Sequence, residues 1–166
     1  MIKLRFLLPL LVAVLLGGCV SAPQPVPKGY TGPVAKIADT SAPVSDTKIY
    51  FFELEGIDGR GVLSSSSATT QTNHGRGFYM EPVLEARSVP AGGPLKLKLG
   101  AYTHVAAPIL AFGGKMYSVS GEVEVTLEAD KTYRVKGVLS KEYCAVWLED
   151  EAGQIVSTKI EKGQKP

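Results

Sequence analysis

Few side chains in this sequence are suited to catalysis. The chain has two histidines, His74 and His104, and two cysteines, Cys19 and Cys144. Nucleophilic catalysis needs a nucleophile, a base and an orienting acid held together, but the serines before His74 lack a Gly-x-Ser-x-Gly turn. Cys144 lies in the apolar stretch YCAVWL, which favours a small buried side chain. Two histidines without further thiols argue against zinc, so we expect no catalytic residue, no metal and no cofactor.

The best candidate for a binding surface is the stretch SSSSATTQTNHGRGFYMEP, residues 64–82. Its small polar residues predict a loop. Arg76 lies between two glycines, where its guanidinium could meet a carboxylate or phosphate. The alternative is that the glycines form a bend or bulge leading into a strand, with Phe78 and Met80 packed inside. The candidate ligand or partner contacts in this stretch are Arg76, Phe78, Tyr79 and His74.

The beginning of the chain has the pattern of a cleaved export signal. Lys3 and Arg5 precede the apolar run FLLPLLVAVLL, residues 6–16. A membrane-spanning helix needs roughly 20 apolar residues, whereas a basic start, a short apolar core and small residues are typical of a secretory signal. The alternative, a buried core helix, fits poorly with Pro9 and the glycine pair that follows the run.

Leu16-Gly17-Gly18-Cys19 resembles the lipobox of bacterial lipoproteins. The resemblance implies that residues 1–18 are a signal peptide, that Cys19 receives a diacylglycerol on its sulfur, and that its new amino group takes a fatty acid such as palmitate. Two or three acyl chains hold a protein stably on a membrane. Because Val20 rather than aspartate follows the cysteine, the resemblance favours the outer membrane, with the protein facing the periplasm. The inner membrane and the cell surface remain alternatives.

The charge balance gives no reason to expect a nucleic-acid partner. The sequence has 18 basic and 16 acidic residues, and Lys3 and Arg5 account for the difference. Without residues 1–18 the chain is formally neutral, so no basic excess remains to attract nucleic acid. We expect a membrane contact through the lipid anchor and a second partner that is an envelope protein or the cell wall.

The chain divides into a tether, a domain and a short tail. Prolines at positions 23, 25 and 27 predict that residues 19–31 are an extended, mobile tether, with a first strand as the alternative. Residues 32–161 are long enough for one domain with a core, and residues 162–166 form the tail.

The domain has the sequence pattern of an all-β fold. Apolar residues alternate or form short runs between glycines and prolines, which indicates strands. Asp58-Gly59 predicts a hairpin turn, and residues 102–112 fit an edge strand, a crossing segment or a short helix. We expect a two-sheet antiparallel sandwich of seven to nine strands, Ig-like or transthyretin-like. The predicted strands are residues 33–39, 47–54, 83–89, 95–99, 119–127, 132–139, 143–148 and 155–160.

The body of the chain resembles a group of small uncharacterised bacterial lipoproteins over residues 30–153. The shared segments are YTGPVAKIADT, FFELEGIDGRGV, NHGRGFYMEP, RSVPAGGPLKL, HVAAPI, VSGEVEV, YRVKG and AVWLEDEAG. The resemblance implies no catalytic residues. We therefore expect a non-enzymatic binding or scaffolding module of the envelope. The alternatives are a lipoprotein component of a secretion or envelope assembly machine, and a small envelope enzyme that would need His74 or His104 in a concave site beside an acid.

Overall fold

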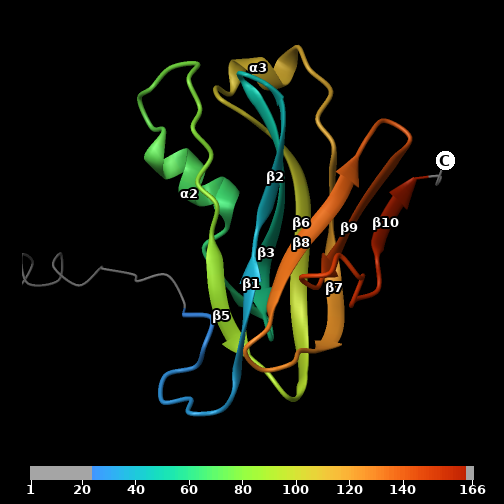
Figure 1. Cartoon of the computed structure of the whole chain (residues 1–166). Helices are drawn as coiled ribbons and strands as arrows, with labels where there is room; N and C mark the ends of the chain where they lie inside the picture. The colour runs from blue at the N-terminus through green and yellow to red at the C-terminus, as the bar shows by residue number, and fades with distance from the viewer. Residues whose placement is uncertain (1–23, 164–166) are drawn as a thin grey trace, which may run out of the picture.

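Two five-stranded sheets pack face to face in the computed structural model, which describes residues 24–163 (Figure 1). The expected two-sheet all-β sandwich is confirmed, and the described part contains ten strands rather than seven to nine. The predicted signal peptide, Cys19 and the tail residues 164–166 lie outside the described residues. Neither helix in the described range is long and apolar enough to cross a membrane.

The first sheet contains the first and last strands of the described chain. Its strand order is β10-β9-β8-β1-β5, in which β1 runs parallel to β8 and the other neighbours are antiparallel. The parallel pair departs from the expected meander, because the chain leaves β1 for the other sheet. The strands are β1 Val34–Ala38, β5 Ala86–Pro90, β8 Thr132–Leu139, β9 Tyr143–Glu149 and β10 Ile160–Gly163.

The second sheet is antiparallel, with strand order β2-β3-β6-β7 and a short β4 beside β3. The predicted turn between β3 and β4 is confirmed, since Asp58 and Gly59 have φ angles of 48° and 76°, as a tight hairpin of this kind requires. The strands are β2 Thr40–Ser45, β3 Lys48–Ile57, β4 Arg60–Gly61, β6 Pro94–Val105 and β7 Ser118–Thr126.

The core lies between the sheets and follows the alternation seen in the sequence. On β6, the leucines at positions 95, 97 and 99 are buried, while Lys96 and Lys98 are exposed. On β3 both faces are buried, as the apolar run predicted: Phe52 and Leu54 join the core between the sheets, and Phe51 is buried outside that cluster. Burying each such side chain contributes roughly 1.5–3 kcal/mol to the stability of the fold. β3 and β6 therefore contribute a large part of the core.

Several predicted boundaries shift in the structure. The strand expected at residues 83–89 is β5, which begins at Ala86, and the one expected at residues 155–160 is β10, which begins at Ile160. Ser157 explains the second shift, because its hydroxyl accepts a hydrogen bond from the Leu148 amide at 2.9 Å in place of a strand partner. β10 reaches Gly163, so it includes residues that were expected in the tail.

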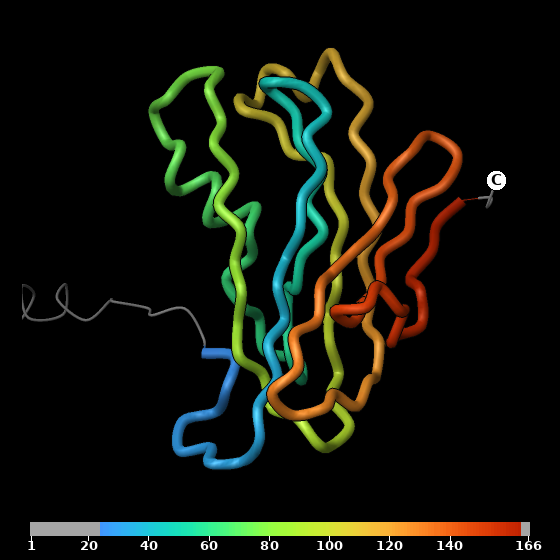
Figure 2. Tube along the Cα trace, in the orientation of Figure 1, coloured from blue at the N-terminus to red at the C-terminus, as the bar shows by residue number. Residues whose placement is uncertain are grey.

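The described part of the tether folds into a turn instead of an extended chain. Gly29 has a φ of 82°, and the Tyr30 amide donates to the Pro27 carbonyl at 3.0 Å. This segment joins β1 at the end of the sandwich where β6 begins, since the Ala91 amide bonds to the Pro33 carbonyl. Figure 2 shows the tether segment at the lower end and the chain after β6 at the upper end. We call the upper end the distal end.

Gly137 fills a position on β8 with no room for a side chain. A Cβ atom there would lie 2.5 Å from Cδ1 of Phe52 and would also overlap the Ala145 carbonyl oxygen. We expect Gly137→Ala to lower the free energy of unfolding by about 1–3 kcal/mol, because overpacking forces core atoms to move. Urea unfolding checks this. Gly93→Ala is the control, since no atom lies within 4 Å of its new Cβ; equal stability of the two variants would contradict the prediction.

Candidate functional site

Residues 65–72, expected to form a loop, are instead the helix α2 (Ser65–Thr72). Ser64 caps it, accepting a hydrogen bond from the Ser67 amide on its hydroxyl oxygen. The Ser65 amide donates to Asp39 at 3.2 Å and the Ser66 amide to Glu53 at 2.8 Å. These carboxylates satisfy amides that a helix start leaves unpaired, and they complement the positive end of the helix dipole. Contacts distant in sequence therefore make this segment helical.

Asp39 and Arg87 form a buried ion pair at the start of α2. The Arg87 guanidinium donates to both Asp39 oxygens, at 3.0 and 2.9 Å, and also to the Leu63 carbonyl. Asp39 further accepts from the Leu54 amide at 2.9 Å and from the Ser65 hydroxyl at 2.7 Å. The two side chains are only 0% and 7% exposed. The pair thus joins the β1–β2 connection, β3, β5 and α2 at one point.

Glu53 is a second buried carboxylate at the same helix end. It accepts hydrogen bonds from the Ser66 amide and from the Ser66 hydroxyl, at 2.8 and 2.7 Å. Burial raises the pKa of Glu53 above its ordinary value, an effect that the hydrogen bonds from Ser66 oppose and the nearby charge of Asp39 reinforces. The start of α2 therefore carries a pH-sensitive group.

Asn73 closes the loop that follows α2, residues 74–80. Its side-chain amide donates to the carbonyls of Thr69 and Glu81, both at 2.8 Å, and its side-chain oxygen accepts from the Glu81 amide at 2.9 Å. Thr69, fully buried, accepts from the Val83 amide at 2.9 Å. The two ends of the loop are thus held together on α2, and its position follows that of the helix.

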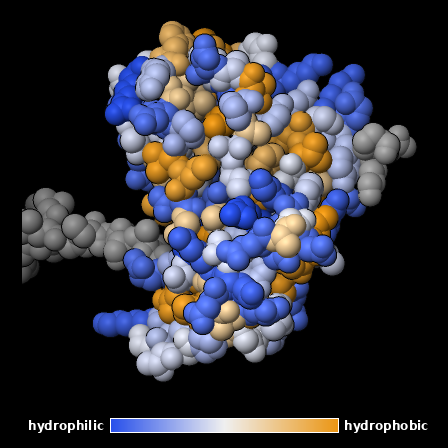
Figure 3. Space-filling view, in the orientation of Figure 1, coloured by the Kyte–Doolittle hydropathy of each residue, from blue (hydrophilic) through white to orange (hydrophobic). Residues whose placement is uncertain are grey.

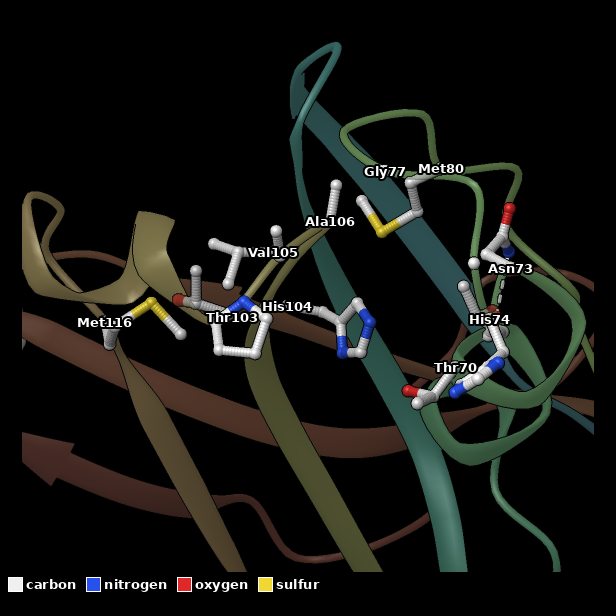
Figure 4. A pocket seen from close by; sticks show the side chains of 14 residues that line it. Thr70, Asn73, His74, Gly77, Met80, Thr103, His104, Val105, Ala106 and Met116 are labelled. Atoms are coloured by element: carbon white, nitrogen blue, oxygen red, sulfur yellow. Dashed lines mark hydrogen bonds between the residues drawn. The ribbon is translucent and has the colours of Figure 1, made fainter.

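A pocket of about 560 Å³ lies at the distal end between this loop and the end of β6. His74 and Met80 come from the loop, His104 from β6, and Met116 from the segment after α3 (Ile109–Phe112). In Figure 4 the His74 and His104 imidazoles and the Met80 thioether lie on one side of the pocket, and Met116 lies beyond His104. No Asp, Glu, Lys, Arg or Cys lines this pocket in the described part of the chain.

His104 is the rigidly held member of this group. Its ring packs edge-on against Phe51, with the ring centres 5.5 Å apart at 77°. The preceding residue, Thr103, is buried and accepts a hydrogen bond from the Tyr117 amide at 2.9 Å. Burial lowers the pKa of His104 below its ordinary value, because an apolar site disfavours the charged imidazolium. The surroundings of His104 on β6 therefore favour the neutral form of its imidazole.

The structure brings together only part of the predicted site. His74 lines the pocket, whereas Phe78 and Tyr79 are 59% and 63% exposed, so the alternative that packed Phe78 inside is wrong. Arg76 is exposed and pairs with Glu81 at 3.4 Å. Cys144 is buried, as predicted. Cys19 lies outside the described residues.

Both histidines line one concave site. The enzyme alternative requires a histidine in such a site and also an acidic side chain beside it. The acid neighbour that the enzyme alternative requires is not among the described residues that line the pocket. Within residues 24–163, no three His, Cys, Asp or Glu side chains are grouped so as to hold a metal ion. The described pocket is suited to bind through imidazole, thioether and backbone groups.

Sequence reasoning missed the residues that position this site: Asp39, Glu53, Asn73 and Arg87. One signal was present. Arg87 has the same strand phase as the buried Val89, and an ionisable residue at an inward position indicates a buried partner. Asn73, before a glycine-containing loop, gave no comparable signal.

Another ionisable group lies on β3 and β6, outside the pocket. The Tyr102 hydroxyl donates to Glu55, and Lys98 lies 3.4 Å from the same carboxylate. Burial and the hydrogen bond to Glu55 raise the pKa of Tyr102 to about 12. Gly100 leaves room for them, since a Cβ there would lie 2.8 Å from Cδ of Glu55.

Arg87→Met should strongly destabilise the domain. The substitution leaves Asp39 buried with neutral donors only, and breaking a buried pair costs about 3–5 kcal/mol. Denaturant unfolding measures the loss. Arg76→Met is the matched control, because it breaks an exposed pair worth about 0–1 kcal/mol. Equal losses in the two variants would contradict the role given to Arg87.

The raised pKa of Glu53 predicts how stability varies with pH. Above pH 4.5 the unfolded chain loses the Glu53 proton while the folded protein still holds it, so folding becomes less favourable as pH rises toward the folded-state pKa. We expect wild type to lose stability relative to Glu53→Gln across this range in unfolding series at several pH values. Glu81→Gln, at an exposed position, is measured in the same series as the control variant. A constant difference between wild type and Glu53→Gln would contradict the raised pKa.

No family model matches this chain, and neither the curated proteins nor the solved structures contain a match to it. A sandwich fold by itself hosts many unrelated functions. The distal pocket and the residues around it are therefore the features from which a function can be inferred.

Proposed function

We propose that this protein is a non-enzymatic binding module, anchored by lipid on Cys19 to a membrane of the bacterial envelope, whose distal end binds another envelope protein. The observation that carries the proposal is a set of exposed apolar side chains bordering the pocket. Phe78, Tyr79, Ile109 and Phe112 are 59%, 63%, 65% and 89% exposed. We call these four residues the distal rim.

The distal rim comes from the two segments that form the pocket. Phe78 and Tyr79 lie between the lining residues Gly77 and Met80, and Ile109 directly follows the lining residue Pro108. Figure 3 shows apolar surface at the upper end of the face in view. Exposed apolar patches on a folded domain mark interaction sites, and aromatic side chains contribute most of the binding energy at protein interfaces.

The position of the rim suits a tethered protein. The chain joins β1 near the start of β6, and the pocket lies at the other end of β6 (Figure 2). Twelve residues of β6 span roughly 35–40 Å at about 3.3 Å per residue. An anchor at Cys19 would leave the rim facing away from the membrane, where it is accessible to a partner.

The anchor rests on the lipobox resemblance of Leu16-Gly17-Gly18-Cys19. Lipid on this cysteine would hold the domain at the membrane without any spanning helix. We place it in the outer membrane facing the periplasm, because Val20 follows the cysteine.

Labelling with radioactive palmitate tests the anchor. Wild type should incorporate label and stay in the membrane fraction after a carbonate wash, whereas Cys19→Ser should do neither. Release of wild type by the wash, or a mature chain that begins at another residue, would overturn this part of the proposal.

Photocrosslinking in intact cells tests the rim. A photoreactive phenylalanine analogue at position 78 or 112 should yield a discrete protein conjugate. The same analogue at Ile155, which is 46% exposed on the β9–β10 connection, is the control. Conjugates of equal yield from all three positions, or none from the rim, would refute the proposed surface. Conjugates released only by a muramidase would replace the protein partner by the cell wall.

A further inference from the structure

The pocket behind the distal rim gathers an unusual set of side chains. His74, His104, Met80 and Met116 all line it, and they are all the histidines and methionines of residues 24–163. They come from the loop after α2, from β6, and from the segment after α3, which are separated in the sequence. The fold, not the local sequence, brings these four groups together.

These groups are the ones that a soft metal ion prefers. Thioethers select Cu(I), imidazole suits copper and zinc, and carboxylates suit Mg²⁺, Ca²⁺ and Mn²⁺. Zinc sites use cysteine, histidine and carboxylate ligands, and the pocket lining contributed by residues 24–163 has no carboxylate or thiol. The ion common to imidazole and thioether is copper in its monovalent state, which also carries the smallest charge into a neutral pocket.

The arrangement separates the two methionines. Figure 4 shows Met80 directed from the loop toward the side of the pocket that contains both imidazoles, and Met116 on the far side of His104. His104 is fixed on β6 by Phe51. His74 and Met80 lie on the loop whose ends Asn73 closes, and Gly75 and Gly77, with φ angles of 83° and 66°, shape its backbone. One ligand is therefore on a rigid strand and two are on a loop.

We propose that the pocket binds one Cu(I) ion through His74, His104 and Met80. This site goes beyond the protein-binding function proposed above and does not depend on it. The ion sits behind the rim, so a partner docked on the rim would cover it. No oxidation or reduction is part of the proposal; the protein holds the monovalent ion.

Competition with the Cu(I) chelator bicinchoninate, under anaerobic conditions on the full chain in detergent, tests the site. Wild type should withdraw one equivalent of Cu(I). Losing even a residue that only hydrogen-bonds to a metal ligand weakens affinity by roughly 10- to 100-fold. We therefore expect a loss of at least about tenfold for His74→Ala, His104→Leu and Met80→Leu. Met116→Leu is the matched control and should stay within about twofold of wild type.

Two of these variants keep the test independent of folding. His74 is exposed, and Met80→Leu preserves side-chain volume, so circular dichroism should show an unchanged fold for both. X-ray absorption at the copper edge should show a sulfur neighbour that Met80→Leu removes and Met116→Leu retains.

Three results would overturn the site. They are that wild type withdraws no Cu(I) from the chelator, that Met116→Leu loses as much Cu(I) affinity as Met80→Leu, or that wild type binds Zn²⁺ as tightly as Cu(I). Each is measured on the purified protein without a partner. Failure of the Cu(I) site and failure of the crosslinking experiment are therefore separate outcomes.

Discussion

The buried ion pair of Arg87 and Asp39 lies where the two sheets and α2 come together, and it positions α2 relative to β3 and β5. Asp39 is fully enclosed and accepts hydrogen bonds from the Leu54 amide, from the Ser65 amide and hydroxyl, and from both arms of Arg87. Burying two charges costs several kcal/mol per ion unless every lone pair is satisfied. Here the required donors come from three separate elements, so the ion pair is stable only when α2, β3 and β5 are all in place.

The same requirement fixes one wall of the pocket. The start of α2 is held by Asp39 and Glu53, and its end carries Asn73, which closes the loop bearing His74 and Met80. The opposite wall is the end of β6, whose position follows from its pairing with β3 and β7. The pocket is thus formed between an element held by polar contacts and an element held by the sheet. Its shape depends on residues that do not line it.

The sequence predicted the parts of the fold whose cause is local. Alternation on β6 and the Asp58-Gly59 turn depend only on neighbouring residues, and both are confirmed. Residues 65–72 were missed because serine and threonine have weak helix propensity; the carboxylates that make the segment helical lie 13 and 26 positions earlier. The candidate site followed the same pattern. His74 was identified, but its meeting with His104 depends on the folded sheet. Residue type and spacing could not decide whether Phe78 is exposed or buried, because a glycine-containing loop and a bend leading into a strand both fit the sequence around it.

The buried charged side chains and the uncharged pocket lie at opposite ends of α2. This separation determines which ligands the pocket can bind. The buried charges lie at the start of α2, where helix amides and a guanidinium surround them. The pocket at the other end of the helix has no charged lining residue in the described chain. A highly charged ligand would find no countercharge there, and burying it unpaired would be costly. The site is therefore suited to neutral or singly charged ligands that imidazole, thioether and backbone groups can satisfy. Because the apolar rim comes from the same two segments as the pocket lining, a protein that covers both would also remove water from the pocket, and every polar contact inside would become stronger.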